Sequence, residues 1–107
     1  MYTVYEDRDN SFAVQLVKNE VKLTTAEMQA ITKIAVMFDG TEYDSDTYPA
    51  GFDWTTREDE GVVILTLGSV LTAPARDTKA ELLIYTLTDT DGLVWDLLDI
   101  KVVDISA

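Results

Sequence analysis

From Ile31 onward, the chain is a succession of short runs rich in Val, Ile, Leu, Thr and Tyr, separated by Asp-Gly turns and acidic loops. Within several runs, large apolar residues recur at every second position, which is the period of a β-strand that buries one face. Glycine in an Asp-Gly pair accepts the positive φ angle that a tight hairpin turn requires. The pattern therefore predicts a small β domain built from antiparallel hairpins.

The runs predict an all-β sandwich of seven to eight strands, because turn signals recur about every 8–12 residues. The expected strands are at 12–17, 31–38, 62–67, 79–88 and 93–103, and shorter candidate segments are at 2–5, 21–23, 41–43 and around Phe52 and Trp54. The run at 93–103 is expected to alternate, with Val94, Leu98, Ile100 and Val102 on one face and Trp95 and Leu97 on the other.

One short helical turn is expected before the clearest strand. Thr24 or Thr25 is positioned to cap a turn that extends to Ala30, and Glu27 stands near the capping-box position. A segment this short has no independent helical stability, so packing against the sandwich must hold it in place.

The length and the charge of the chain narrow its class. Its 107 residues predict a single domain spanning residues 1–107. The chain carries 20 Asp and Glu against 8 Lys and Arg, a net charge of -12. A nucleic-acid backbone or an anionic membrane would repel such a surface, so neither is expected as a partner.

The composition also removes much catalytic chemistry. The chain has no Cys and no His, which excludes disulfides, thiolate metal sites and His-based nucleophilic triads. The spacing of Ser and Lys gives no support to a Ser-Lys pair. We predict that the chain is not an enzyme and has no catalytic residue, metal ligand or cofactor.

The acidic turn Asp89-Thr90-Asp91-Gly92 resembles part of a calcium-binding loop. When it is aligned to that pattern, Leu87 and Leu98 stand where the first and last acidic ligands belong. The sequence therefore favours a hairpin turn over a calcium site.

No targeting segment is apparent. Residues 1–10 lack the basic start and the apolar stretch of a signal peptide. Apolar runs such as Val62–Leu65 are too short to cross a bilayer. We expect neither a signal peptide nor a transmembrane segment.

Aromatic and acidic residues gather between residues 43 and 60, the long irregular part of the chain. Two roles are open for this segment: a recognition surface or a lid over the core. The residues predicted to bind a partner are Tyr43, Tyr48, Asp44 and Asp46, and the aromatic residues predicted for the core are Phe38, Phe52 and Trp54.

The order of these motifs resembles a known family. The strand that ends in Phe38-Asp39-Gly40 is followed by Tyr43-Asp44-Ser45, by Phe52-Asp53-Trp54 and by Asp91-Gly92-Leu93-Val94-Trp95. This series, over residues 31–103, is similar to small immunoglobulin-like structural proteins of tailed phages and prophages, associated with the tail, baseplate or head.

The resemblance implies an immunoglobulin-like sandwich that acts as a structural or assembly module through protein–protein contacts, in a virion or in the host cytoplasm. Its partners would be other virion or assembly proteins, or a second copy of the chain. Two alternatives stay open. One is a carbohydrate-binding sandwich that stacks sugars on Tyr48, Phe52 and Trp54, and the other is an acidic inhibitor of a basic host protein.

Overall fold

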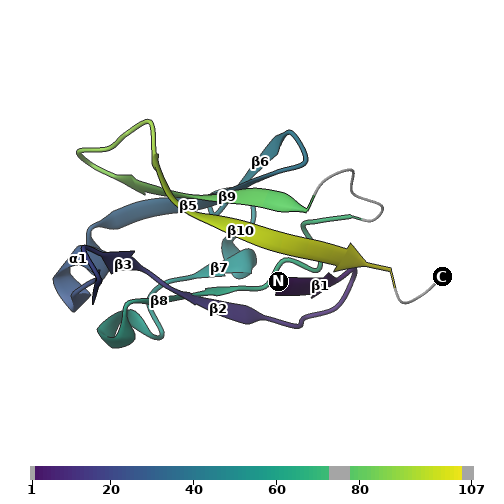
Figure 1. The fold of residues 1–107 in the computed structure, drawn as a ribbon, viewed down its shortest axis with the longest axis horizontal. Coiled ribbons are helices and arrows are strands. Elements are labelled where there is room, and N and C mark those ends of the chain that lie inside the picture. The colour runs from purple at the N-terminus through teal and green to yellow at the C-terminus, as the bar shows by residue number, and fades with distance from the viewer. Residues whose placement is uncertain (1, 73–77, 105–107) are drawn as a thin grey trace.

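Two β-sheets packed face to face form the framework of the chain, in a computed structural model that describes residues 2–72 and 78–104 (Figure 1). One sheet has five strands in the order β1-β10-β9-β5-β6, and the other has three in the order β2-β8-β7. The strands are β1 Tyr2–Tyr5, β2 Phe12–Gln15, β5 Ile31–Phe38, β6 Thr41–Asp44, β7 Phe52–Asp53, β8 Val62–Leu65, β9 Lys79–Thr86 and β10 Leu93–Val103. A small hairpin of β3 Val17–Lys18 and β4 Val21–Lys22 lies beside them.

The strand order corresponds to that of an immunoglobulin-like domain. Immunoglobulin strands are named by letters in chain order. In that naming, β5, β9 and β10 correspond to strands C, F and G of the larger sheet, whose pairs are antiparallel. The smaller sheet β2-β8-β7 corresponds to strands B, E and D. The β6 strand adds to the edge of the larger sheet, as an extra strand does in variable-type domains. The predicted all-β sandwich is confirmed.

One strand pair departs from the predicted antiparallel arrangement. Strand β1 runs parallel to β10, with Tyr2 opposite Ile100 and Tyr5 opposite Val103. These segments lie at opposite ends of the sequence, and no turn joins them. The local turn signals that reveal antiparallel hairpins therefore carry no information about this pair.

The predicted helical turn is confirmed as α1, Thr25–Gln29, at one end of the sandwich (Figure 1). The Thr24 hydroxyl accepts a hydrogen bond from the Glu27 backbone N–H, and the Glu27 carboxylate accepts from the Thr24 backbone N–H, which completes a capping box. Met28 is fully buried and attaches the turn to the core. Among the described residues, no helix is long and apolar enough to span a membrane.

Two predicted turns also form. Asp39 and Gly40 join β5 to β6 with φ angles of 50° and 82°, the double positive φ of a tight hairpin. The Asp89–Gly92 segment forms part of the β9–β10 loop, where the Asp89 backbone N–H donates to the Thr86 hydroxyl at 3.0 Å. The turn interpretation of this acidic segment is confirmed.

The core lies between the two sheets. Ile34 and Val36 from β5 and Leu82 from β9 face Val63 and Leu65 from β8, and all five side chains are fully buried. Burial of each such side chain contributes about 1.5–3 kcal/mol to folding. Phe38 and Phe52 are also in the core, at 2% and 4% exposure, and Trp54 is half-buried against it.

The predicted facing of β10 is wrong at its start. The register shifts between Val94 and Asp96, so the strand has one extra residue, Trp95, at this point. Such a bulge breaks the period of two. Trp95 is half-buried and packs against the core, whereas Val94 is 56% exposed. Beyond the bulge, Leu98 and Ile100 are buried as expected.

Candidate interaction surface

Two rows of side chains cross the solvent-facing side of the five-stranded sheet, which we call the outer face. The strand register places the side chains of each row on neighbouring strands β6, β5, β9 and β10. The first row is Glu42, Met37, Glu81 and Leu97, and the second is Asp44, Ala35, Leu83 and Val94. Each row begins with a carboxylate on the edge strand and ends with an apolar residue on β10.

The apolar members of these rows lie on three neighbouring strands and form a strip that Glu81 interrupts between Met37 and Leu97. Leu97 is 72% exposed and Val94 is 56% exposed, while Met37 and Leu83 are half-buried. Ala35 lies beneath its neighbours and is fully covered. Single exposed apolar residues are common, but a strip that crosses adjacent strands is typical of a contact surface.

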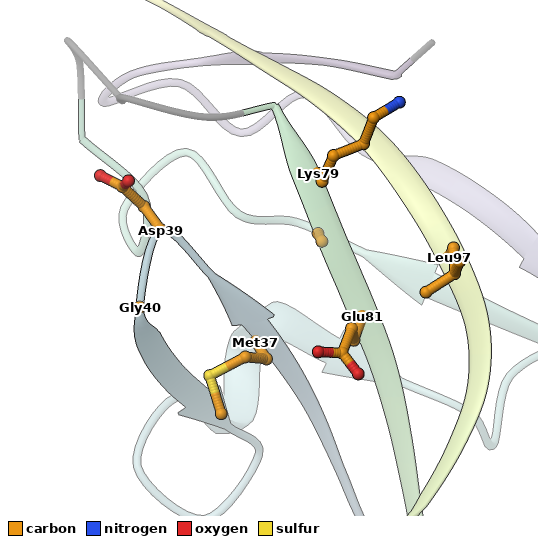
Figure 2. A pocket seen from close by; sticks show the side chains of 7 residues that line it. Met37, Asp39, Gly40, Lys79, Glu81 and Leu97 are labelled. Carbon is orange, nitrogen blue, oxygen red and sulfur yellow. The ribbon is translucent and has the colours of Figure 1, made fainter.

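A shallow hollow of about 560 Å³ lies at one end of the strip. Figure 2 shows Met37, Glu81 and Leu97, from β5, β9 and β10, side by side along it. The Asp39–Gly40 turn and the Lys79 side chain lie at its end. The hollow therefore combines apolar side chains with charged ones, with Glu81 between Met37 and Leu97 and Asp39 and Lys79 at the end.

Ion pairing organises one end of the outer face. The Lys79 ammonium lies 3.0 Å from Asp99 Oδ1, across the β9-β10 pair. The hydrogen bond from Lys79 lowers the pKa of the Asp99 carboxyl below its usual range. Both side chains are well exposed, so the pair adds little to stability and mainly positions two charges.

A second polar group links the other strands. The Tyr85 hydroxyl on β9 donates a hydrogen bond to the Glu42 carboxylate on β6. That bond, with the negative charge of Glu42, raises the pKa of Tyr85 to about 12. The Lys33 ammonium on β5 lies 4.1 Å from the centre of the Tyr85 ring. Together these contacts hold side chains from three strands in fixed positions.

The two tyrosines predicted to bind a partner face the interior. Tyr43 is opposite Val36, a buried core residue, and is therefore on the inner side of the sheet. The rings of Tyr43 and Tyr48 lie 6.1 Å apart, and both pack against the core. These two side chains cover the open edge of the sandwich, which corresponds to the lid role rather than to a flat recognition surface.

The two acidic residues predicted to bind a partner lie at the end of β6 and in the turn after it. Asp44 is on the outer face opposite Ala35, and its carboxylate accepts a 2.8 Å hydrogen bond from the Thr47 backbone N–H. This bond lowers the pKa of Asp44. Asp46 is exposed in the turn that follows β6. Asp46 lines a hollow together with Lys33 and Tyr85, so both acidic residues border the outer face, whereas the two tyrosines pack against the core.

A second hollow, of about 400 Å³, lies at the edge of the three-stranded sheet beside Pro49, Phe52 and Trp54. The Asp53 carboxylate within it accepts hydrogen bonds from the backbone N–H groups of Thr55 and Thr56 and from both threonine hydroxyls. The bond from the Thr56 hydroxyl is the largest of the effects that lower the pKa of Asp53. Its oxygens are committed to the local turn, and the buried Phe52 ring offers no face for a sugar to stack on.

The acidic residues do not gather into a metal site within residues 2–72 and 78–104. No group of three or more carboxylates there could hold an ion together. The carboxylates of Glu27, Asp44 and Asp53 accept bonds from neighbouring backbone N–H groups. These acids therefore cap local structure.

The sequence contained a signal for the outer face that the predictions did not use. Both long C-terminal strands have leucines on opposite faces, Leu82 with Leu83 on β9 and Leu97 with Leu98 on β10. A strand with one solvated face ordinarily alternates apolar and polar residues. Apolar residues on both faces therefore mark the second face as a candidate contact surface.

A comparison of the chain with protein-family models, curated proteins and solved structures finds no match in any of the three. The function is therefore inferred from the chemistry of the surface.

Proposed function

We propose that the chain is a non-enzymatic immunoglobulin-like module that binds another protein through its outer face. The apolar strip that crosses β5, β9 and β10 carries this proposal. Leu97 and Val94 are left in solvent although the fold has a complete core elsewhere. Covering these side chains on binding would release apolar surface from water, at about 25 cal/mol for each Å² buried.

The margins of the strip would set the orientation of the partner. Glu42 and Asp44 stand at the β6 end of the two rows, and Lys79 and Asp99 form an ion pair beside the hollow. Charges at the rim of an interface contribute more to partner choice and orientation than to affinity. An apolar centre with a mixed-charge rim is the usual composition of a protein–protein contact.

The setting that we propose is a tailed-phage virion or its assembly, where the chain would be a structural or assembly module. Support comes from the resemblance of residues 31–103 to immunoglobulin-like phage proteins and from the immunoglobulin-like strand order. In this setting the partner would be another virion or assembly protein, or a second copy of the chain.

Site-specific photo-crosslinking in the cells that express the chain tests the contact surface. A photoreactive benzophenone amino acid would replace Leu97 on the outer face or, as a matched control, Val21 on the β3–β4 hairpin. The two side chains have similar exposure, 72% and 63%. We expect a discrete adduct from position 97 and none from position 21.

Mass spectrometry of the adduct then tests the setting. An adduct with a virion or assembly protein, or with the chain itself, supports the phage proposal. An adduct with an unrelated host protein contradicts the phage setting but not the contact surface. The absence of any adduct at position 97, or equal adducts at both positions, contradicts the contact surface itself.

A further inference from the structure

The outer face differs in charge from the rest of the molecule. Its outward-facing charged side chains are three lysines and four carboxylates, namely Lys33, Lys79, Lys101, Glu42, Asp44, Glu81 and Asp99. These strand positions sum to -1, and with Asp39 and Asp46, which line hollows beside Met37 and Lys33, the local net charge is -3. The whole chain carries -12, and three of its eight cationic residues lie on this one face. Most of the acidity that would repel another copy of the chain is therefore carried outside the outer face.

A strongly basic partner would not favour this face. Most of the 20 acidic residues are not among those of the outer face, and a polycationic surface would be attracted first to the regions that carry them. A face that carries charges of both signs is suited to a partner whose own face is also mixed. The chain itself has such a face.

Most charges on the outer face already have a partner within the chain. Lys79 pairs with Asp99, Lys33 lies over the Tyr85 ring, and Glu42 accepts from the Tyr85 hydroxyl. Asp44 accepts from the Thr47 backbone. Within the described residues, the side chains of the remaining two, Glu81 and Lys101, take part in no hydrogen bond or ion pair.

These two groups have opposite charges and flank Leu97. Glu81 is directly opposite Leu97 on the neighbouring strand, and Lys101 is four residues beyond Leu97 on β10. A two-fold axis midway between Glu81 and Lys101 would set Glu81 of each copy against Lys101 of the other, since such an interface uses the same patch twice. The Leu97 side chains of both copies would then lie within the same interface.

The available area is sufficient for such a pair. Each residue in a strand covers roughly 16 Å² of a sheet face, from the spacing along and between strands. The five strands contain 35 residues, which gives roughly 550 Å² per copy and 1,100 Å² for two. A specific interface needs about 1,000 Å², so the face is large enough for a modest dimer.

We propose that the outer face pairs with the outer face of a second copy, with Glu81 of one copy against Lys101 of the other. This inference rests on the proposed function, because it names the partner of the same surface. It also predicts an unusual salt response. Screening weakens the long-range repulsion between two chains of -12, so salt strengthens the dimer, whereas it would weaken a complex with a basic protein.

Sedimentation equilibrium of the full chain tests the pairing with charge-reversal variants. We expect Glu81→Lys and Lys101→Glu each to weaken self-association at least tenfold, which corresponds to about 1.4 kcal/mol. The double variant exchanges the charges of both reciprocal pairs and should return to within about threefold of the parent chain. Both side chains are on the surface, and circular dichroism would verify that each variant is folded.

A second pair of variants separates the apolar contact from charge. Leu97→Glu should weaken the dimer at least as much as either reversal, whereas Val21→Glu adds the same charge away from the face and should leave it unchanged. For the parent chain, the association constant should rise between about 50 mM and 500 mM NaCl.

A chain that is monomeric at all concentrations and both salt levels, or a double variant that is not restored, would overturn the inference. If Leu97 then still crosslinks to a different protein, the proposed function stands without the dimer. If no adduct forms at that position either, the proposed function fails as well.

Discussion

At the scale of single residues, the bulge in β10 carries a free-energy cost at Trp95. The extra residue directs the indole toward the core, where its Nε1–H is buried without an acceptor among the described residues. A buried donor that has lost water without gaining a partner costs about 1–3 kcal/mol. The packing of the large ring must offset that cost in the folded state.

Trp95→Phe should therefore be tolerated better than an ordinary Trp→Phe change. The smaller ring loses packing, but removal of the unpaired N–H offsets much of that loss, so the free energy of unfolding should fall by no more than about 1 kcal/mol. Urea denaturation measures it, with Trp54→Phe as the comparison. A larger loss at Trp95 than at Trp54 would contradict this explanation.

Substitution of two glycines by alanine should destabilise the fold for different reasons. At Gly40 the reason is the backbone conformation, and at Gly68 it is a steric clash. Gly40 has a φ of 82° with no atom within 4 Å of an added Cβ, so Gly40→Ala should cost only about 1–2 kcal/mol for the left-handed backbone. At Gly68, an added Cβ would lie 1.9 Å from the Arg8 carbonyl oxygen and 2.7 Å from that of Tyr5. Gly68→Ala must move backbone and should destabilise by more, as thermal denaturation would record. Equal effects of the two variants would be inconsistent with this close approach.

The Tyr85 hydroxyl gives the outer face a defined alkaline response. Its pKa is raised to about 12 by Glu42, so the folded state favours the protonated phenol. The stability from this contact is fully present below the unfolded pKa, near 10, and is lost as the pH rises through 12. Glu42→Gln should lower the pKa of Tyr85 toward 10, measured from the ring resonances by NMR. An unchanged pKa in this variant would show that Glu42 is not the cause.

At the scale of elements, helix α1 depends on its cap and on one buried side chain. Five residues are too few to hold a helix alone, so the Thr24 capping box and Met28 maintain it. Thr24→Ala should lower the free energy of unfolding by about 1 kcal/mol, whereas Thr25→Ala, one residue later and exposed, should change it little. Chemical denaturation of the two variants measures the difference, and an equal loss in both would argue against the cap.

The elements that could be predicted from sequence are those with local causes. The Asp39–Gly40 turn needs only its own backbone preferences, and the capping box of α1 lies within four residues. The parallel pairing of β1 with β10 and the bulge at Trp95 have no local cause. Both depend on how distant segments meet, so the alternation rule predicted the wrong face for Val94 and Trp95.

The candidate site was harder to predict for the same reason. Tyr43 and Asp44 are neighbours in sequence, yet adjacent strand positions point to opposite faces, so the structure places one against the core and the other on the outer face. Met37, Leu83 and Leu97 come from three strands that only the sheet brings together. Composition indicated contact chemistry, but the register of the sheet decided which face carries it.

For the whole molecule, the central feature is the separation of charge from exposed apolar surface. A net charge of -12 discourages contact over most of the surface, and the outer face is a region where apolar residues are exposed beside charges of both signs. Net charge of this size favours solubility and works against unspecific association. A contact through the outer face therefore meets less electrostatic repulsion than a contact through the more acidic regions of the surface.

A methyl NMR footprint of the complex tests this account most directly, using the partner captured by crosslinking or the chain itself at raised concentration. The account predicts that the methyl signals of Met37, Leu83, Val94 and Leu97 shift together on binding. Those of Val21 on the β3–β4 hairpin and of Val63 in the core should stay in place. Shifts confined to the three-stranded sheet, or to the segment around Tyr48 and Trp54, would contradict the outer face as the contact surface.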